Sequence, residues 1–95
     1  MRLKNDQKVF LKKCINAVLP DADIFLFGSR ANDQLKGGDI DILVIDKSKF
    51  TFQQIRDVKI AFYKEFGEQK IDIVSFKWDE SSTFRDLALL EAIKL

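Results

Sequence analysis

The sequence predicts a fold of the α/β (α+β) class, in which helices cover a small mixed β-sheet. Three short apolar runs have the length of strands, at residues 23–27, 39–45 and 70–76. Longer segments repeat apolar residues at helical spacing, at residues 5–19 and 52–66. The 95 residues are enough for a single domain, residues 1–95, with one modest core.

The first expected helix covers residues 5–19, and either Asn5 or Asp6 can serve as its N-cap. Its apolar stripe consists of Phe10, Leu11, Cys14, Ile15 and Val18. Pro20 ends the helix because a proline ring cannot continue it. We interpret the cysteine on this stripe as a small core residue rather than a reactive thiol.

The strand at 39–45 is predicted to be the central strand of the sheet. Side chains two apart in a strand share a face, so Asp39 and Asp41 lie together, about 6.5 Å apart. Both faces of the strand are apolar further along, which is typical of a strand that is covered on both sides.

Two neighbours are expected for this strand. The short connection from Ser29 to Asp39 makes the strand at 23–27 an antiparallel neighbour. The helix at 52–66 is a crossover to the strand at 70–76, and such strand–helix–strand units are parallel and right-handed. The parallel pairing brings Asp72 beside the other two aspartates.

Three carboxylates at one end of a sheet lose hydration and repel one another, and a divalent cation removes both costs. Asp39, Asp41 and Asp72 offer hard oxygen ligands. The sequence has no histidine and one cysteine, which favours magnesium or manganese over zinc. In isolation Asp72 is best interpreted as a surface residue of an edge strand. Its position beside the other aspartates favours a third ligand.

A second part of the expected site begins at Gly28, which lets the backbone approach a ligand closely. Ser29 is a suitable N-cap for a short helix over residues 30–36, which the glycine pair at 37–38 ends. The free N–H groups of a helix N-terminus bind phosphate, and Arg30 adds a charge-assisted bond. A plain strand–turn–strand connection is the alternative. We prefer a site for a nucleoside triphosphate and metal ions because three features meet at one end of the sheet.

The second long helix, residues 52–66, is expected to end at Gly67 and to bury a stripe of Ile55, Val58, Phe62 and Phe66. A last helix is expected over residues 82–94, with apolar residues around much of its circumference. We assign Phe84 and Leu87 to the core, and some of Leu89, Leu90 and Ile93 to a partner interface. The equally supported alternative is that this helix only closes the open face of the sheet.

Composition excludes several classes of function. The net charge of +1 gives no global field that attracts nucleic acid. A single cysteine excludes an internal disulfide and fits a reducing cytoplasm, the expected localisation. The chain starts with a charged segment rather than a signal peptide, and no apolar run is long enough to span a membrane. Catalytic triads that need histidine are excluded.

Three motifs together resemble a known family: Gly-Ser-Arg-Ala at 28–31, Asp-Ile-Asp-Ile-Leu-Val at 39–44 and Ile-Asp-Ile-Val at 71–74. They resemble the nucleotidyltransferase fold of the DNA polymerase β superfamily. The chain is most similar to the minimal nucleotidyltransferases, small partners of HEPN-domain proteins, over about residues 10–76. The combination is fairly specific, although no single motif is. Asn32, Asp33 and Gly38 stand where the family commonly has Arg, Gly and Ser.

The resemblance implies a magnesium-dependent enzyme with ATP as its substrate. Its catalytic residues, which would also hold two Mg²⁺ ions, are Asp39, Asp41 and Asp72. Its nucleotide-binding residues are Gly28, Ser29 and Arg30. The resemblance further implies that AMP is transferred to a tyrosine hydroxyl of a HEPN-domain toxin, with this chain as the antitoxin in a hetero-oligomer.

Two alternatives stay open at this point. The chain is either an enzyme or a non-catalytic binding module that neutralises its partner by direct contact, and the altered residues Asn32 and Asp33 leave room for the second. Addition of nucleotides to a nucleic-acid end is the third interpretation. The near-neutral charge and the lack of a strand-binding domain argue against it.

Overall fold

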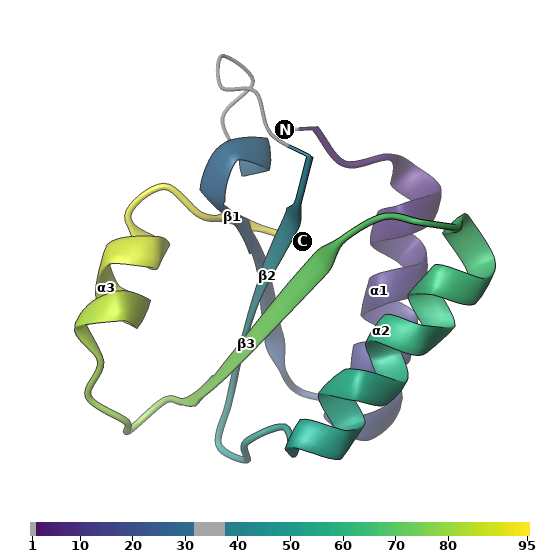
Figure 1. Ribbon diagram of the computed structural model, residues 1–95. Helices are drawn as coiled ribbons and strands as arrows, with labels where there is room; N and C mark the ends of the chain where they lie inside the picture. Colours follow the sequence, from purple (N-terminus) through teal and green to yellow (C-terminus); the bar gives the residue numbers. More distant parts are fainter. Residues whose placement is uncertain (1, 32–37) are drawn as a thin grey trace.

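Three helices and a four-stranded mixed sheet make up the described part of the computed structural model, which covers residues 2–31 and 38–95 (Figure 1). The helices are α1 (Asn5–Val18), α2 (Phe52–Phe66) and α3 (Thr83–Leu89). The strands are β1 (Asp23–Phe27), β2 (Ile40–Asp46), β3 (Ile71–Lys77) and β4 (Ile93–Lys94). A 3-10 turn, η1 (Gly28–Ala31), follows β1. The predicted fold class is confirmed.

The strands lie in the order β3-β2-β1-β4. β1 pairs antiparallel with β2 and with β4, and β2 pairs parallel with β3. β2 is therefore a central strand, and its residues Ile42 to Ile45 are fully buried. The two pairings that the sequence predicted for this strand are both confirmed.

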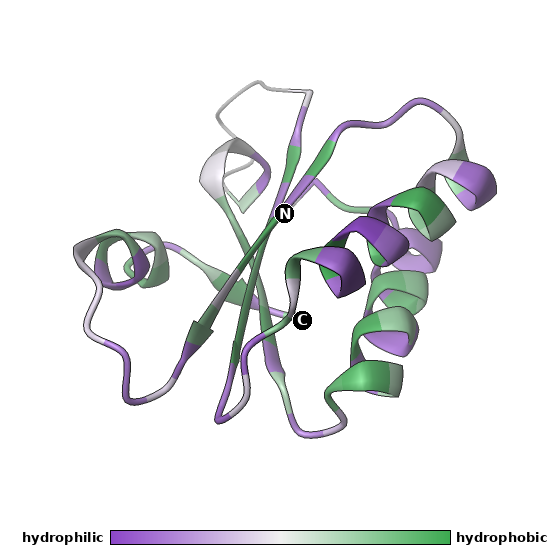
Figure 2. Ribbon diagram, turned by 60° about the horizontal axis from the view of Figure 1, so that its bottom comes forward, coloured by the Kyte–Doolittle hydropathy of each residue, from purple (hydrophilic) through white to green (hydrophobic). Residues whose placement is uncertain are grey.

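The main core lies between one face of the sheet and the two long helices, α1 and α2, which lie together on that face (Figure 1). Its fully buried members are Leu11, Ile15, Leu26, Ile40, Ile42, Val44 and Phe62. Phe10 packs edge-on against Phe62 and Phe66, with ring centroids 6.2 and 5.4 Å apart. Figure 2 shows the strands as hydrophobic in the centre, whereas the helices alternate between hydrophobic and hydrophilic residues. No helix in the described ranges is long and apolar enough to cross a membrane.

The opposite face of the sheet is covered by α3, a helix of seven residues (Figure 1). The Phe84 ring lies edge-on to Phe27 and tilted over Phe76, with centroids 5.9 and 6.2 Å away. None of the helix's own residues is buried, and Leu87 is 63% exposed. Phe84 therefore faces the sheet as predicted, although it is half-exposed, whereas the prediction that Leu87 faces the core was wrong. A helix of only about two turns that lies over the sheet contacts it through few side chains.

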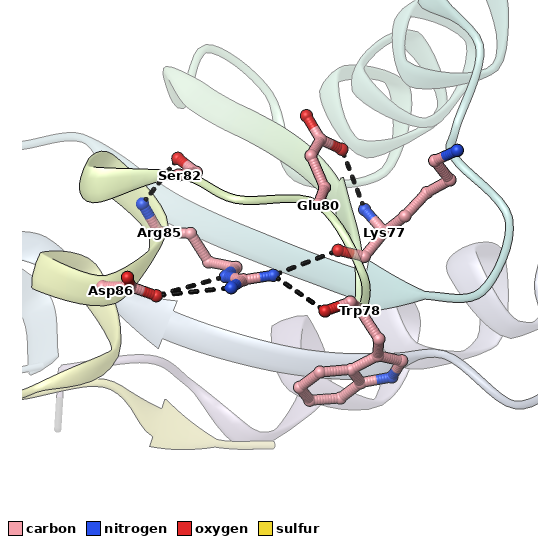
Figure 3. A network of polar contacts seen from close by, with 6 residues as sticks. All are labelled: Lys77, Trp78, Glu80, Ser82, Arg85 and Asp86. Carbon is pink, nitrogen blue, oxygen red and sulfur yellow. Dashed lines mark hydrogen bonds and ion pairs between the residues drawn. The ribbon is translucent and has the colours of Figure 1, made fainter.

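A polar network fixes α3 to the end of β3 (Figure 3). Ser82 caps the helix, because its Oγ accepts a hydrogen bond from the Arg85 backbone N–H at 3.1 Å. The Arg85 guanidinium donates to the carbonyl oxygens of Lys77 and Trp78 at 3.1 and 3.2 Å. Glu80 accepts a hydrogen bond from the Lys77 backbone N–H. The position of α3 thus depends on polar contacts more than on burial.

The C-terminal end differs from the prediction of one helix over 82–94. The helix ends at Leu89, and Ile93 and Lys94 form β4 beside β1, with Ile93 opposite Leu26. The Leu95 N–H extends this pairing by donating to Ile24 O at 2.8 Å. A strand forms here instead of a longer helix because it satisfies backbone groups on the otherwise open edge of β1. Ile93 therefore belongs to the sheet and not to a partner-facing helix side.

The start of α1 also differs, because Lys4 is the N-cap in place of Asn5 or Asp6. The Lys4 N–H donates to Gln7 Oε1 at 3.2 Å, which satisfies a backbone donor that the helix leaves open. Val18, assigned to the apolar stripe, lies at the last turn and is 39% exposed. The predicted bounds of α2 and its end at Gly67 are confirmed.

Candidate active site

Asp41 and Asp72 occupy facing positions on the parallel strands β2 and β3. Burial alternates along β3, with Ile71 and Ile73 buried and Asp72 and Val74 half-buried. Asp72 therefore points to the face that α3 covers. Asp41 and Asp72 lie side by side because each is the second residue of its strand, and in this parallel pair residues with the same offset from the strand start are neighbours.

The electrostatics show that the three predicted aspartates share one region. Burial raises the pKa of the Asp41 carboxyl above its ordinary value, and the negative charges of Asp72 and then Asp39 raise it further. Lys70 acts in the opposite direction and lowers it. The folded chain thus holds carboxylates against one another at the edge where β2 and β3 begin.

Asp39 stands apart from the other two in its contacts. It precedes β2 by one residue, and its side chain is 47% exposed and forms an ion pair with Lys70 Nζ at 3.6 Å. Within the described residues, no group of three or more acidic, cysteine or histidine side chains is close enough to hold a metal ion. Exposed ion pairs of this kind contribute about 0–1 kcal/mol, so a cation that binds Asp39 displaces Lys70 at small cost.

The residues present fit a divalent cation in two respects. Their ligand atoms are carboxylate oxygens, which magnesium and manganese prefer. Burial, and then the negative charges of Asp72 and Asp39, raise the pKa of Asp41, and a cation bound to these carboxylates would stabilise their ionised forms. Asp41 and Asp72 would supply the paired ligands of such a cation, and Asp39 would join them on release from Lys70.

Gly28 packs directly against the Asp41 carboxylate. Its φ is +73°, and a Cβ at this position would collide with the carboxylate of Asp41. Only glycine combines that backbone conformation with that closeness. The predicted helix N-cap at Ser29 was wrong, because the turn η1 already starts at Gly28 and Ser29 lies inside it. The rest of the predicted short helix, residues 32–36, and Asn32 and Asp33 with it, lie outside the described residues.

Arg30, predicted to contact phosphate, is engaged by the protein itself. Its Nη1 donates to Arg2 O at 2.8 Å, its Nε to Asp39 O at 3.2 Å and its Nη2 to Gly38 O at 3.1 Å. Nη2 also donates to Gln69 Oε1 at 3.4 Å, and the Gln69 amide donates to the same Gly38 carbonyl. The guanidinium therefore holds the backbone that carries Asp39. A phosphate contact by Arg30 stays a prediction.

A groove of about 490 Å³ lies in front of the carboxylates. It is lined by Phe27, Asp41, Phe52, Ile55, Lys59, Asp72, Ile73, Val74 and Phe84. Sequence reasoning missed its aromatic residues. The predicted antiparallel pairing could have revealed Phe27, because its register places this residue opposite Asp41. No such signal was available for Phe52 and Phe84, because their helices reach the groove only through the tertiary fold.

In this small mixed sheet, a glycine turn packs against an aspartate of the central strand, and a second aspartate lies on the parallel neighbouring strand. This arrangement defines a nucleotidyltransferase of the polymerase β type. The chain belongs to the family described as polymerase beta, nucleotidyltransferase, whose model matches residues 6–95. The predicted superfamily is confirmed.

Solved structures share the fold. One is a mutant of the toxin–antitoxin pair MntA–HpeT, with 20% identity and a TM-score of 0.67 over 97% of this chain and 71% of the matched chain. Another is a tri-AMPylated Shewanella oneidensis HEPN toxin in complex with MNT antitoxin, with 18% identity and a TM-score of 0.58 over 92% of this chain and 69% of the matched chain. No curated protein matches the sequence.

Proposed function

We propose that this protein transfers AMP from ATP to a tyrosine hydroxyl of a HEPN-domain toxin and thereby acts as its antitoxin. The observation that carries the proposal is the groove that has both Asp41 and Asp72 in its lining. Family membership supports the reaction class. The similarity to structures of toxin–antitoxin pairs supports the kind of partner.

In this proposal the triphosphate lies at Gly28 and Ser29, with Arg30 at its edge. Two Mg²⁺ ions held by Asp39, Asp41 and Asp72 would neutralise charge on the triphosphate and lower the pKa of the attacking hydroxyl. Asp72 accepts the hydroxyl proton. The tyrosine oxygen forms a bond to the α-phosphorus, the bond from that phosphorus to the bridging oxygen breaks, and pyrophosphate leaves.

The lining of the groove supports an aromatic acceptor. Phe27 and Phe84 pack edge to face beside the carboxylates, and Phe52 lies at the rim with 87% of its surface exposed. Aromatic rings attract one another in such arrangements, by about 0.5–1.5 kcal/mol beyond the burial of area. A tyrosine ring held among them presents its hydroxyl to the acidic end of the groove.

One set of observations favours the alternative, a binding module without catalysis. Asp39 is paired with Lys70, and Arg30 is engaged by backbone carbonyls rather than open to a ligand. In that case the fold neutralises its partner by contact, and the carboxylates are dispensable.

Mass spectrometry of the partner separates the two functions. A candidate HEPN-domain partner is incubated with the chain, ATP and magnesium, and its peptides are searched for added AMP. The proposal expects the addition on tyrosine with the wild-type chain and none with Asp41→Asn. Asp21→Asn, an exposed aspartate in a turn remote from the groove, is the matched control and leaves the addition intact. An unmodified partner that is still neutralised supports the binding module.

A further inference from the structure

The outer side of α2 carries a second groove, of about 610 Å³, which we call the α2 groove. It is lined by Phe52, Ile55, Arg56, Lys59, Ile60, Tyr63 and Lys64. Phe52 is the most exposed large apolar side chain of the described residues, at 87%, and Tyr63 is 54% exposed. Both rings recur along one side of the helix, because residues eleven apart return to the same face.

The charge around these rings has one sign. Arg56, Lys59 and Lys64 line the α2 groove, and none of its lining residues is acidic. The chain as a whole is nearly neutral, at +1, so this local excess of cations does not reflect the composition. Exposed aromatic anchors surrounded by cations are complementary to an apolar segment that carries carboxylates.

The α2 groove is continuous with the groove that contains the aspartates. Phe52, Ile55 and Lys59 line both of them. A segment that lies along α2 and passes these shared residues therefore arrives at Asp41 and Asp72.

We propose that the α2 groove docks an acidic, amphipathic segment of the HEPN-domain partner, and that this contact directs the acceptor tyrosine into the neighbouring groove. The inference rests on the proposed function for the identity of the partner. Phe52 and Tyr63 anchor the apolar side chains of that segment, and Arg56 and Lys64 pair with its carboxylates. The partner is thus recognised away from the carboxylates that carry the chemistry.

Calorimetric titration of a candidate HEPN-domain partner into this chain, without ATP, tests the inference. Arg56→Glu and Tyr63→Ala are expected to raise the Kd by about tenfold each, as loss of an interface anchor does. Lys13→Glu changes the same charge on an exposed residue of α1, and we expect it to leave the Kd unchanged. Circular dichroism confirms that each variant is folded. Wild-type affinity in both groove variants, or no binding by the wild-type chain, overturns the inference.

Two further measurements identify other occupants. If the wild-type chain binds phosphatidylserine vesicles and Arg56→Glu abolishes this, or if Tyr63→Ala converts a dimer to a monomer in light scattering, the groove serves another surface and the inference is wrong. Because binding is measured apart from transfer, the two proposals fail separately. A partner that docks through the groove but receives no AMP overturns the proposed function alone. Transfer with unaffected groove variants overturns the docking site alone.

Discussion

Gly28 lies so close to Asp41 that any side chain at residue 28 would overlap the Asp41 carboxylate. The contact joins the end of β1 to the start of β2, where the antiparallel register sets Phe27 opposite Asp41. The glycine turn and the central aspartate are therefore one unit. The turn at Gly28 and the strand motif that contains Asp41 are separate in the sequence, and strand pairing brings them together.

The first prediction concerns this contact. Gly28→Ala places a Cβ on a residue with positive φ and in collision with Asp41. In urea unfolding we therefore expect the free energy of unfolding to fall by more than the roughly 1–3 kcal/mol that backbone strain alone costs. Gly67→Ala is the matched control for strain, because its φ is +81° but no atom lies within 4 Å of the added Cβ. Gly38→Ala adds a methyl group in open space and should be neutral. Equal losses at residues 28 and 67 would show that the overlap with Asp41 is not real.

The second prediction concerns pH. The fold raises the pKa of Asp41, so ionisation of this carboxyl destabilises the folded state, and the destabilisation develops as pH rises through the raised pKa. Asp41→Asn removes it. We expect Asp41→Asn to have a higher Tm than the wild type at pH 7. This Tm difference should shrink as the pH is lowered below the ordinary aspartate pKa.

Scanning calorimetry of both chains across that pH range is the measurement, and Asp21→Asn is its control. Magnesium should raise the Tm of the wild type and not that of Asp41→Asn, because the cation relieves the same repulsion. A Tm difference that grows in acid would contradict the assigned direction of the pKa shift.

The third prediction concerns Arg30. Its guanidinium binds the carbonyl oxygens of Arg2, Gly38 and Asp39 in a planar fork that a lysine cannot reproduce. Arg30→Lys should therefore lower the free energy of unfolding by about 1–3 kcal/mol, the cost of leaving such groups unpaired. Arg56→Lys, on the exposed side of α2, should lie within about 0.5 kcal/mol of wild type. Urea titration measures both. Unchanged stability with weakened ATP binding would instead assign Arg30 to the phosphates.

The fourth prediction concerns the apolar surface of α3. Leu87 and Leu90 are 63% and 77% exposed, so Leu87→Glu and Leu90→Glu should leave the fold intact and weaken the complex with the HEPN-domain partner. Leu43→Glu, at a fully buried position under α3, should unfold the domain. Circular dichroism and co-purification report the two effects. A complex that survives both surface changes would place the interface elsewhere.

The sequence predicted β2, β3 and α2 because their signals are local. Apolar runs and helical spacing fix such elements, and the crossover rule then predicts that β2 and β3 are parallel, which brings Asp41 and Asp72 to the same end of the sheet. The end of the chain was not predictable in this way. Ile93 and Lys94 form a strand only because β1 offers an open edge, and a two-residue pattern carries no periodicity.

The candidate site follows the same division. Asp41 and Asp72 on two strands, and Asp39 just before the first of them, were visible as motifs, and so was Gly28. Asp39 forms an ion pair with Lys70, and Arg30 donates hydrogen bonds to backbone carbonyl oxygens. These contacts join residues 8 to 31 positions apart in the sequence, and loop geometry brings them together. Such contacts have no spacing rule, so sequence patterns did not show that both side chains are engaged within the protein.

The central claim, that the carboxylates carry nucleotidyl transfer, is tested most directly with ATP labelled at its α-phosphate. The chain, magnesium and a HEPN-domain protein that binds the chain are incubated together, and label on that protein is measured over time. The account predicts transfer by the wild type, a loss of at least about 100-fold in Asp41→Asn and Asp72→Asn, and wild-type rates in Asp21→Asn. Undiminished transfer by both aspartate variants, or no transfer by a wild-type chain that binds its partner, would contradict it.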